Sequence, residues 1–212
     1  MIGDGALTFR EFVMRESTPL SAIHEAVLEF LRGRDDAVLY GAQAVNAYVD
    51  EPRMSQDVDL MSVRAAPLAE ELRALLHGRF DIAVRVRSVA GGAGQRVYQV
   101  RRPKNRHLVD VRLVTSLPPT RRVDELLVLT PVELICAKVV SMVNRTMTPK
   151  GLTDEADLRR LLLTFPDLKT QTGVVRDRLE AAVSEGMDAP VLAAWERLVA
   201  QAFQLEDDEL GY

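Results

Sequence analysis

Two carboxylates separated by a single residue, Asp57 and Asp59, are the side chains of this 212-residue sequence whose spacing best suits chemistry. Residues 57–61 alternate polar and apolar side chains, a pattern typical of a strand. Because side chains alternate across a strand, both carboxylates are expected on one face. Paired carboxylates suit Mg²⁺, which takes oxygen ligands and leaves positions open for substrate phosphates. The alternative is an exposed acidic strand that binds nothing.

A glycine upstream of the pair adds a second feature. Residues 37–40 form a short apolar run that predicts a buried strand, Gly41 follows at once, and residues 42–49 predict a helix. Glycine lets backbone N–H groups approach a phosphate closely, and the N-terminus of a helix favours an anion. We therefore expect a phosphate to bind near Gly41.

The order of these segments resembles the opening region of nucleotidyltransferases. In that family a strand, a Gly-Gly or Gly-Ser pair and a helix precede a strand that carries Asp-x-Asp. The matching segments here are Gly41-Ala42-Gln43-Ala44-Val45 and Arg53-Met54-Ser55-Gln56-Asp57-Val58-Asp59-Leu60. The resemblance implies an NTP substrate, bound Mg²⁺ or Mn²⁺, and Gly41, Ala42 and Arg53 at the nucleotide. Ala42 departs from the family's Ser or Gly, so a hydroxyl contact with phosphate is lost while the backbone amides remain.

The resemblance also implies a third carboxylate on a later strand, beside the first two. Asp110 is the candidate, because it is the only acidic residue between Asp81 and Asp124. Residues 107–114 alternate, so Asp110 and Arg112 are expected on one face of a strand. Asp110 would then bind metal or act as a base, and Arg112 would contact the nucleotide. The alternative is a solvent-facing Asp–Arg pair.

A polar stripe marks one of the later helices. Lys138, Ser141 and Arg145 are spaced three and four apart, so they lie on one side of an otherwise apolar helix. A lysine in this position is able to reach a triphosphate and to neutralise charge that develops during transfer. The alternative is a surface lysine whose apolar stem lies along the helix while its ammonium stays in water.

The helical part carries a second resemblance, to bacterial AbiEii-type toxins, and the two together cover residues 41–163. In those proteins a helix with a lysine is followed, after a loop, by a helix with an aspartate. The resemblance implies that Lys138 is the lysine and that Asp154 or Asp157 is the aspartate. Asp154 has a further interpretation, as an acid in the first turn of a helix, where the helix dipole favours it.

Charge is distributed unevenly along the chain. The net charge is −4, which argues against a general nucleic-acid coat, yet residues 85–122 hold ten Lys or Arg and one acid. Such a stretch is expected to attract phosphate or RNA, and the alternative is a solvated arginine-rich hairpin. Residues 206–209 have the opposite bias, since all four are acidic.

The elements that must position these residues follow from hydrophobic periodicity. Helices are expected over 19–33, 42–49 and 67–76, and strands over 37–40, 57–61, 82–89, 97–101, 107–114 and 123–129. Further helices are expected over 131–145 with a Thr130 cap, 153–163 with a Thr153 cap, 173–184 and 190–204. This order predicts an α+β fold, with a small mixed-sheet nucleotidyltransferase-like domain over residues 1–129 and a helical C-terminal domain over residues 130–212.

Several classes of protein are disfavoured. No apolar run approaches the roughly 18 residues that span a bilayer, and no signal peptide is visible, so a cytoplasmic protein is expected. Cys136 is the only cysteine and lies between apolar neighbours, which predicts a buried thiol. The three histidines are far apart in sequence, which disfavours zinc. The glycines of residues 91–94 open no helix, which disfavours a dinucleotide site.

The resemblance implies transfer of NMP from an NTP to an RNA acceptor, such as tRNA, or to a protein. It also implies a toxin of a toxin–antitoxin or phage-defence system, whose partner is a separately encoded antitoxin. Two alternatives stay open. Ala42 motivates a catalytically weak or inactive relative that binds nucleotide, and the helical C-terminal third with acidic residues 206–209 motivates a protein-interaction module.

Overall fold

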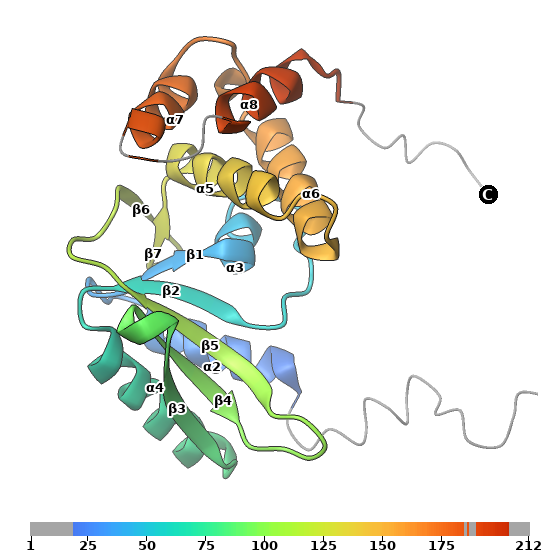
Figure 1. Ribbon diagram of the computed structural model, residues 1–212. Coiled ribbons are helices and arrows are strands. Elements are labelled where there is room, and N and C mark those ends of the chain that lie inside the picture. Colours follow the sequence, from blue (N-terminus) through green and yellow to red (C-terminus); the bar gives the residue numbers. More distant parts are fainter. Residues whose placement is uncertain (1–18, 185, 187–189, 204–212) are drawn as a thin grey trace, which may run out of the picture. The chain divides into compact units, whose positions relative to one another are not determined.

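The computed structural model describes residues 19–184, 186 and 190–203, so the acidic segment 206–209 lies outside the described residues. Within those ranges it contains a seven-stranded sheet and seven α-helices (Figure 1). The first elements are α2 (Leu20–Leu31), β1 (Val38–Tyr40), α3 (Gly41–Asn46), β2 (Val58–Ser62), α4 (Ala65–Phe80), β3 (Val84–Val89), η1 (Ala90–Gly92), β4 (Gly94–Gln99) and β5 (Arg106–Leu113). They are followed by β6 (Thr120–Val123), β7 (Leu126–Leu129), α5 (Pro131–Asn144), α6 (Pro149–Thr164), η2 (Pro166–Leu168), α7 (Val174–Ser184) and α8 (Pro190–Ala200).

The strands follow the order β3-β4-β5-β2-β1-β7-β6. β2 pairs with β5 in parallel, whereas β4 pairs antiparallel with both β3 and β5. The sheet is therefore mixed, and the predicted α+β class is confirmed. In β2, Val58 and Leu60 are fully buried, while Asp59 and Met61 are half-buried. This is the alternation that predicted a strand from the sequence.

The chain divides into two compact units. The first consists of the described residues up to Leu39, together with 54–117 and 124–127. In this unit α4 packs against β3, β4 and β5 (Figure 1). Leu68, Leu72 and Leu76 recur every four residues on one side of α4, and all three are fully buried. This apolar stripe attaches the helix to the sheet.

A register shift interrupts the alternation predicted for residues 107–114. On β4, Val97 pairs with Val109, but the next residue, Tyr98, pairs with His107. Leu108 is thus an extra residue on β5, and both Leu108 and Val109 are fully buried although they are adjacent in sequence. An extra residue in one strand of an antiparallel pair produces this pattern. Strict alternation over the whole segment was therefore wrong.

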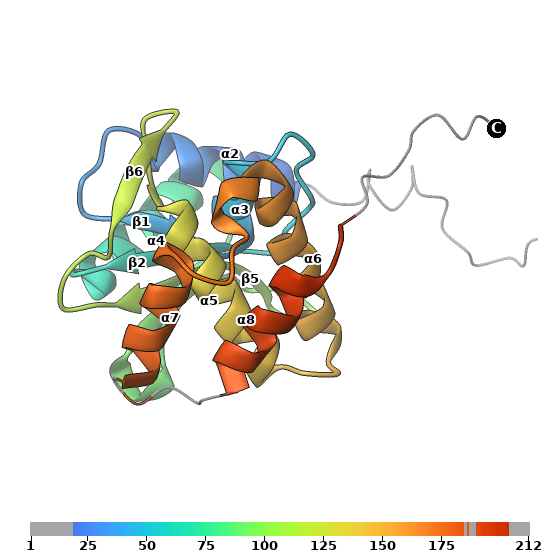
Figure 2. The same cartoon turned by 90° about the horizontal axis from the view of Figure 1, so that it is seen from above.

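The second unit consists of residues 40–53, 118–123 and the described residues from 128 onward. Here α5 packs against α6, α7 and α8, and the rotated view separates α7 from α8 (Figure 2). Trp195 of α8 is fully buried, and its indole N–H donates to the carbonyl oxygen of Thr170 at 3.2 Å. The large ring therefore fills the helical core without leaving a polar group unpaired.

The two helices that carry the predicted polar residues have well-defined starts. Thr130 caps α5 as predicted, because its hydroxyl accepts from the N–H of Glu133 at 3.4 Å. α6 begins earlier than predicted, since the hydroxyl of Thr148 accepts from the N–H of Gly151 at 3.1 Å and Pro149 opens the helix. Thr153 therefore lies inside α6, and the prediction that it caps the helix was wrong. Proline at the first helical position has the φ angle that a helix needs.

The single edge strand predicted over residues 123–129 is two strands. Asp124 and Glu125 separate them with φ angles of 47° and 67°, which form a turn between β6 and β7. β7 lies between β1 and β6 in the sheet, so β6 is the edge strand. The domain boundary expected at Thr130 stays a prediction. No helix in the described ranges is long and apolar enough to cross a bilayer.

We expect substitutions at two helical glycines to have opposite effects on stability. A Cβ atom at Gly151 would lie 2.1 Å from the carbonyl oxygen of Arg145, so Gly151→Ala should destabilise the protein, by about 1–3 kcal/mol as for other overpacked sites. A Cβ at Gly78 meets nothing within 4 Å, so Gly78→Ala should stabilise α4 by about 0.5–1 kcal/mol. Denaturant-induced unfolding measures both changes, and equal effects would contradict the predicted clash at Gly151.

Candidate active site

The first unit brings three carboxylates together at one place on the sheet. Asp59 of β2 pairs in register with Asp110 of the parallel strand β5, and Asp57 precedes β2 by one residue. Asp57, Asp59 and Asp110 are half-buried, and one ligand oxygen from each lies within 4.8 Å of the others. The hydroxyl of Ser55 donates to the carbonyl oxygen of Asp57 at 2.9 Å, which fixes the backbone there. We call these three aspartates the acidic cluster.

The donor set of the acidic cluster fits a hard divalent cation. All three residues offer carboxylate oxygens, and the cluster contains no cysteine or histidine ligand. Mg²⁺ and Mn²⁺ favour such oxygen ligands, and Mg²⁺ is commonly bound by one or two carboxylates together with substrate phosphates. The cluster therefore has the residues for the metal role predicted for it, and that role stays a prediction.

An arginine from the neighbouring strand pairs with the third carboxylate. Arg96 of β4 lies opposite Asp110 in register, and its Nε and Nη2 atoms each donate to a different Asp110 oxygen at 2.6 Å. The hydrogen bonds to Asp110 raise the pKa of Arg96, and the charges of Asp57 and Asp59 act in the same direction. The sequence had indicated Arg112 as the neighbouring arginine. Arg112 is an exposed residue two positions further along β5.

Two histidines for which the sequence indicated no role in a metal site lie close enough to the acidic cluster for its charges to affect their pKa values. Burial lowers the pKa of His24 on α2, while the charge of Asp57 opposes that change. Burial and the charge of Arg96 lower the pKa of His107, while Asp110 opposes them. Both rings are therefore mainly neutral at pH 7. The register shift in β5 explains why His107 lies near the acidic cluster. It pairs His107 with Tyr98, which lies on the same face of β4 as Arg96.

The second unit buries an ionic cluster formed by Lys138, Asp154 and Asp157. The ammonium of Lys138 donates to Asp154 at 2.9 Å and to Asp157 at 2.7 Å. Lys138 is only 6% exposed, so the alternative of a surface lysine was wrong. Asp154 also lies well inside α6, which begins at Pro149, so the first-turn interpretation of this acid was wrong. We call this set the lysine–aspartate cluster.

Asp157 is the centre of the lysine–aspartate cluster. Besides Lys138, it binds Arg53, whose Nε donates to one carboxylate oxygen at 2.5 Å and whose Nη2 donates to the other at 2.7 Å. Burial disfavours ionisation of this fully buried carboxylate, but Arg53 and Lys138 outweigh burial and keep the pKa of Asp157 low. Asn46 holds the backbone of Arg53 by exchanging two hydrogen bonds with it, at 2.9 and 3.1 Å.

Asp154 has a different set of neighbours. Its second oxygen accepts from the hydroxyl of Ser141 at 2.6 Å and from Arg145 at 3.3 Å. The polar stripe predicted on α5 is therefore the surface that receives Asp154. Both aspartates that the sequence could not separate contact Lys138, and the functional aspartate of the pair stays a prediction.

The remaining predicted residues lie at the start of α3. Gly41 has a φ of +72°, a conformation that strongly favours glycine. Ala42 follows in the first turn and is buried.

The thiol of Cys136 is buried, as predicted, and burial raises its pKa to about 12, which makes it a poor nucleophile.

Comparisons with known proteins agree with this fold. The family model for the nucleotidyl transferase AbiEii toxin, type IV toxin–antitoxin system, matches residues 25–208. The Megavirus polyadenylate synthase matches 73% of the chain with a TM-score of 0.57 and 15% identity, and the chain spans 34% of that protein. JHP933 from Helicobacter pylori matches 87% of the chain and 90% of its own length, with a TM-score of 0.51 and 12% identity. No curated protein matches the sequence significantly.

We expect Asp157→Asn to destabilise the protein strongly. The change removes the charge that compensates Arg53 and Lys138, and breaking a buried ion pair from one side costs about 3–5 kcal/mol. Because the folded-state pKa of Asp157 is lowered, its contribution is complete above the unfolded pKa of about 4 and is lost as the pH falls through the folded value. Denaturant unfolding of both proteins from pH 7 to pH 3 measures the difference.

A matched control for this prediction lies on the same helix. Glu155 pairs with Arg159 at 2.8 Å, and both side chains are about a third exposed or more. Glu155→Gln should therefore change stability by no more than about 0.5 kcal/mol. Similar losses in the two variants would show that the lysine–aspartate cluster contributes no more than a surface pair.

Proposed function

This chain belongs to the AbiEii nucleotidyl transferase toxin family, and on that premise we propose that it transfers NMP from an NTP to an acceptor at the acidic cluster. The observation that carries the proposal is the convergence of Asp57, Asp59 and Asp110 within 4.8 Å. Asp59 and Asp110 come from two parallel strands and Asp57 from the residue before the first of them, and together they would hold a divalent cation, which favours oxygen ligands and leaves positions for substrate phosphates. The proposal also includes the identities of the metal, the nucleotide and the acceptor.

The acidic cluster has two tasks in the proposed reaction. Asp57 and Asp59 would hold Mg²⁺ or Mn²⁺, which would offset the negative charge of the triphosphate and of the leaving group. Asp110 would help to hold the metal or would accept the proton of the attacking hydroxyl at one of its carboxylate oxygens. The acceptor oxygen forms a bond to the α-phosphorus, the bond from that phosphorus to the bridging oxygen breaks, and pyrophosphate leaves.

In the second unit, the family resemblance assigns phosphate contacts to Gly41, Arg53 and Lys138. The backbone amides that follow Gly41 contact phosphate oxygens, as its left-handed conformation supports. Lys138 and Arg53 contribute positive charge, and their pairing with Asp157 fixes both head groups. Arg112 of the first unit contributes a further cation. Fixed charges need little rearrangement when the transition state forms, and this is the condition for electrostatic catalysis.

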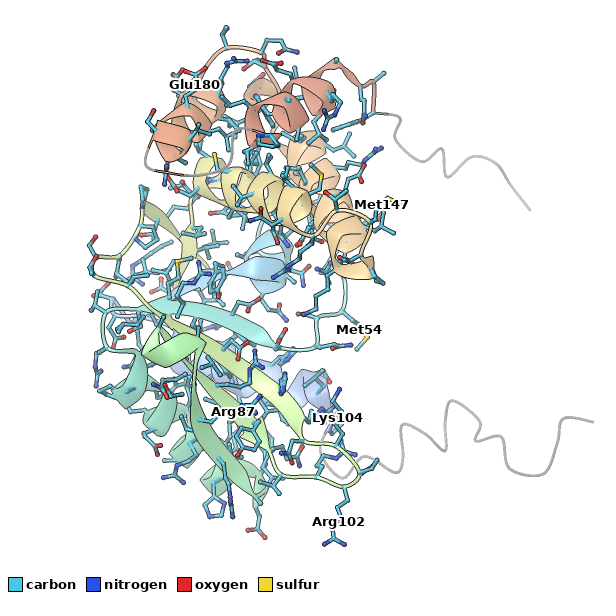
Figure 3. The ribbon with its side chains drawn as sticks, viewed as in Figure 1. Met54, Arg87, Arg102, Lys104, Met147 and Glu180 are labelled. Carbon is cyan, nitrogen blue, oxygen red and sulfur yellow. The ribbon has the colours of Figure 1, made fainter. Side chains whose placement is uncertain are left out.

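An RNA end is the acceptor that the surface beside Asp110 fits best. Arg87, Arg96 and Asp110 pair in one row across β3, β4 and β5. Arg87 is exposed and its guanidinium lies 5.7 Å from the ring centre of Tyr98, which is half-buried. Figure 3 shows Arg87 on β3, and Arg102 and Lys104 in the loop between β4 and β5. Arginines interleaved with aromatic rings suit phosphates and stacked bases, so a tRNA is the first acceptor to test, and a protein is the second.

A nucleotide-binding relative without turnover is the second candidate. Ala42 favours it, because an alanine in the first turn of α3 provides no hydroxyl to a phosphate. In either case we propose a cytoplasmic bacterial protein whose partner is an antitoxin. The described residues contain no further feature that identifies such a partner.

The first test is NTP binding. We expect any NTP that the protein binds to raise the melting temperature of the wild-type protein only when Mg²⁺ is present, because Mg²⁺ would offset the negative charges of the triphosphate and of the acidic cluster. Asp57→Asn should abolish this shift, whereas Asp81→Asn, which removes an exposed acid at the end of α4, should retain it. A shift of equal size in all three proteins would place nucleotide binding away from the acidic cluster.

The second test is turnover. With α-³²P-labelled NTPs, Mg²⁺ and total tRNA, we expect label to enter RNA, and we expect EDTA to prevent it. Asp57→Asn should lower the rate by at least about 10–100-fold, because loss of a metal ligand should cost no less than loss of a residue that only supports a ligand. Nucleotide binding that depends on Asp57, with no transfer to tRNA, to total RNA or to protein, would support the inactive relative and would contradict the proposed enzyme.

A further inference from the structure

Arg96 occupies both oxygens of a carboxylate that the proposed reaction needs. The two hydrogen bonds from Arg96 to Asp110 are 2.6 Å long, and the two side chains are 25% and 22% exposed. Short, parallel N–H···O bonds of this kind are the strongest type of ion pair that arginine forms. A guanidinium also keeps its proton under all ordinary conditions. Arg96 is therefore a permanent cation bound at the edge of the acidic cluster.

The fold holds Arg96 in this position. β4 and β5 place Arg96 directly opposite Asp110. The strands approach closely next to the pair, because a Cβ at Gly94 would lie 3.1 Å from the carbonyl oxygen of Val111. On the other side, Arg87 lies opposite Arg96 and contacts the ring of Tyr98. Like charges on paired strands repel each other. The charge of Arg87 therefore also favours the side-chain conformation in which Arg96 pairs with Asp110.

The acidic cluster needs a cation whether or not a metal is bound. Three carboxylates with oxygens within 4.8 Å repel one another, and the charge of Arg96 acts on Asp57 and Asp59 as well as on Asp110. Arg96 thus supplies part of the compensation that a metal would also supply. A metal that uses an Asp110 oxygen must compete with Arg96 for it.

We propose that Arg96 is a positioning residue that holds Asp110 away from metal coordination until Arg96 finds another anionic partner. The inference rests on the proposed function and specifies the regulation of that same site. With Asp110 held by Arg96, the acidic cluster offers fewer oxygens to a divalent cation, so affinity for that cation is weak before substrate binds. Arg96 and Arg87 lie in one row on the surface beside Asp110, where the RNA acceptor is proposed to bind. A phosphate of that acceptor is therefore the anion that would pair with Arg96 and so release Asp110 from it. Metal binding and acceptor binding are thereby coupled.

The test measures the affinity for Mn²⁺ by isothermal titration calorimetry without NTP or acceptor. Arg96→Gln should bind Mn²⁺ roughly tenfold more tightly than the wild type, the order expected when a charge-assisted bidentate pair no longer competes. Arg87→Gln is the matched control, because it removes the same charge from the adjacent strand β3, where Arg87 pairs with Arg96 and not with Asp110. Its affinity should rise by a smaller factor. An equal rise in Mn²⁺ affinity in both variants would show that only the net charge of the protein matters, and it would overturn the proposal.

A second pair of variants isolates Asp110. In an Asp110→Asn background the guanidinium has no carboxylate to hold, so adding Arg96→Gln should leave the Mn²⁺ affinity nearly unchanged. A tenfold gain in that background would overturn the proposal. Arg96→Lys keeps the charge but loses the bidentate geometry, and we expect an intermediate affinity. It also replaces Arg96→Gln if circular dichroism shows that the glutamine variant does not fold.

Coupling to the acceptor has its own measurement. A single-stranded 12-nucleotide RNA should increase the Mn²⁺ affinity of the wild type and have little effect on Arg96→Gln, in which Asp110 is already free. RNA that changes neither protein, or both equally, would overturn the coupling. Failure of the proposed function gives a different result: Mn²⁺ would then bind equally to wild type and Asp57→Asn, or to neither. If Mn²⁺ affinity falls in Asp57→Asn but is unchanged in Arg96→Gln, the proposed function stands and the role proposed for Arg96 is wrong.

Discussion

Repulsion among three carboxylates is the constraint on which the first unit depends. The parallel pairing of β2 with β5 sets Asp59 beside Asp110, and the bend before β2 adds Asp57. Such a cluster destabilises the fold unless a cation offsets it. The antiparallel strand β4 provides that cation through Arg96. The arrangement of β2, β5 and β4 is therefore both a scaffold for chemistry and a solution to the electrostatic cost of having that scaffold.

The second unit faces the opposite problem, because it takes charges out of water. Asp157 is fully buried, and two cations on residues far apart in sequence, Arg53 and Lys138, satisfy both of its oxygens. Buried ion pairs add little net stability compared with apolar packing, but a single missing partner is costly. The lysine–aspartate cluster therefore specifies the packing of α5 on α6 more than it strengthens it. It also holds Lys138 and Arg53 in defined positions, as the proposed role of their charges at phosphate would require.

The sequence predicted those features that depend on local spacing. Strand alternation placed Asp57 and Asp59 together, the helical spacing of Lys138, Ser141 and Arg145 gave the stripe that receives Asp154, and most elements lie within a few residues of their predicted bounds. Features that depend on pairing between strands could not be predicted. The position of Arg96 opposite Asp110 needs the β4–β5 register, and the shift at Leu108 that brings His107 to this face has no local signature.

Ala42 stands where nucleotidyltransferases carry Ser or Gly, and its surroundings in the structure change the expected effect of that difference. A serine at this position would present a hydroxyl, but Ala42 is buried in the first turn of α3, and the left-handed conformation of Gly41 is retained before it. The backbone geometry that directs amides toward an anion does not depend on the side chain that follows. In the proposed function, phosphate binding would therefore rely on backbone amides and fixed cations. Relative to a serine, Ala42 would remove one contact with the nucleotide, but it would leave unchanged the three carboxylates of the acidic cluster that the proposed transfer uses.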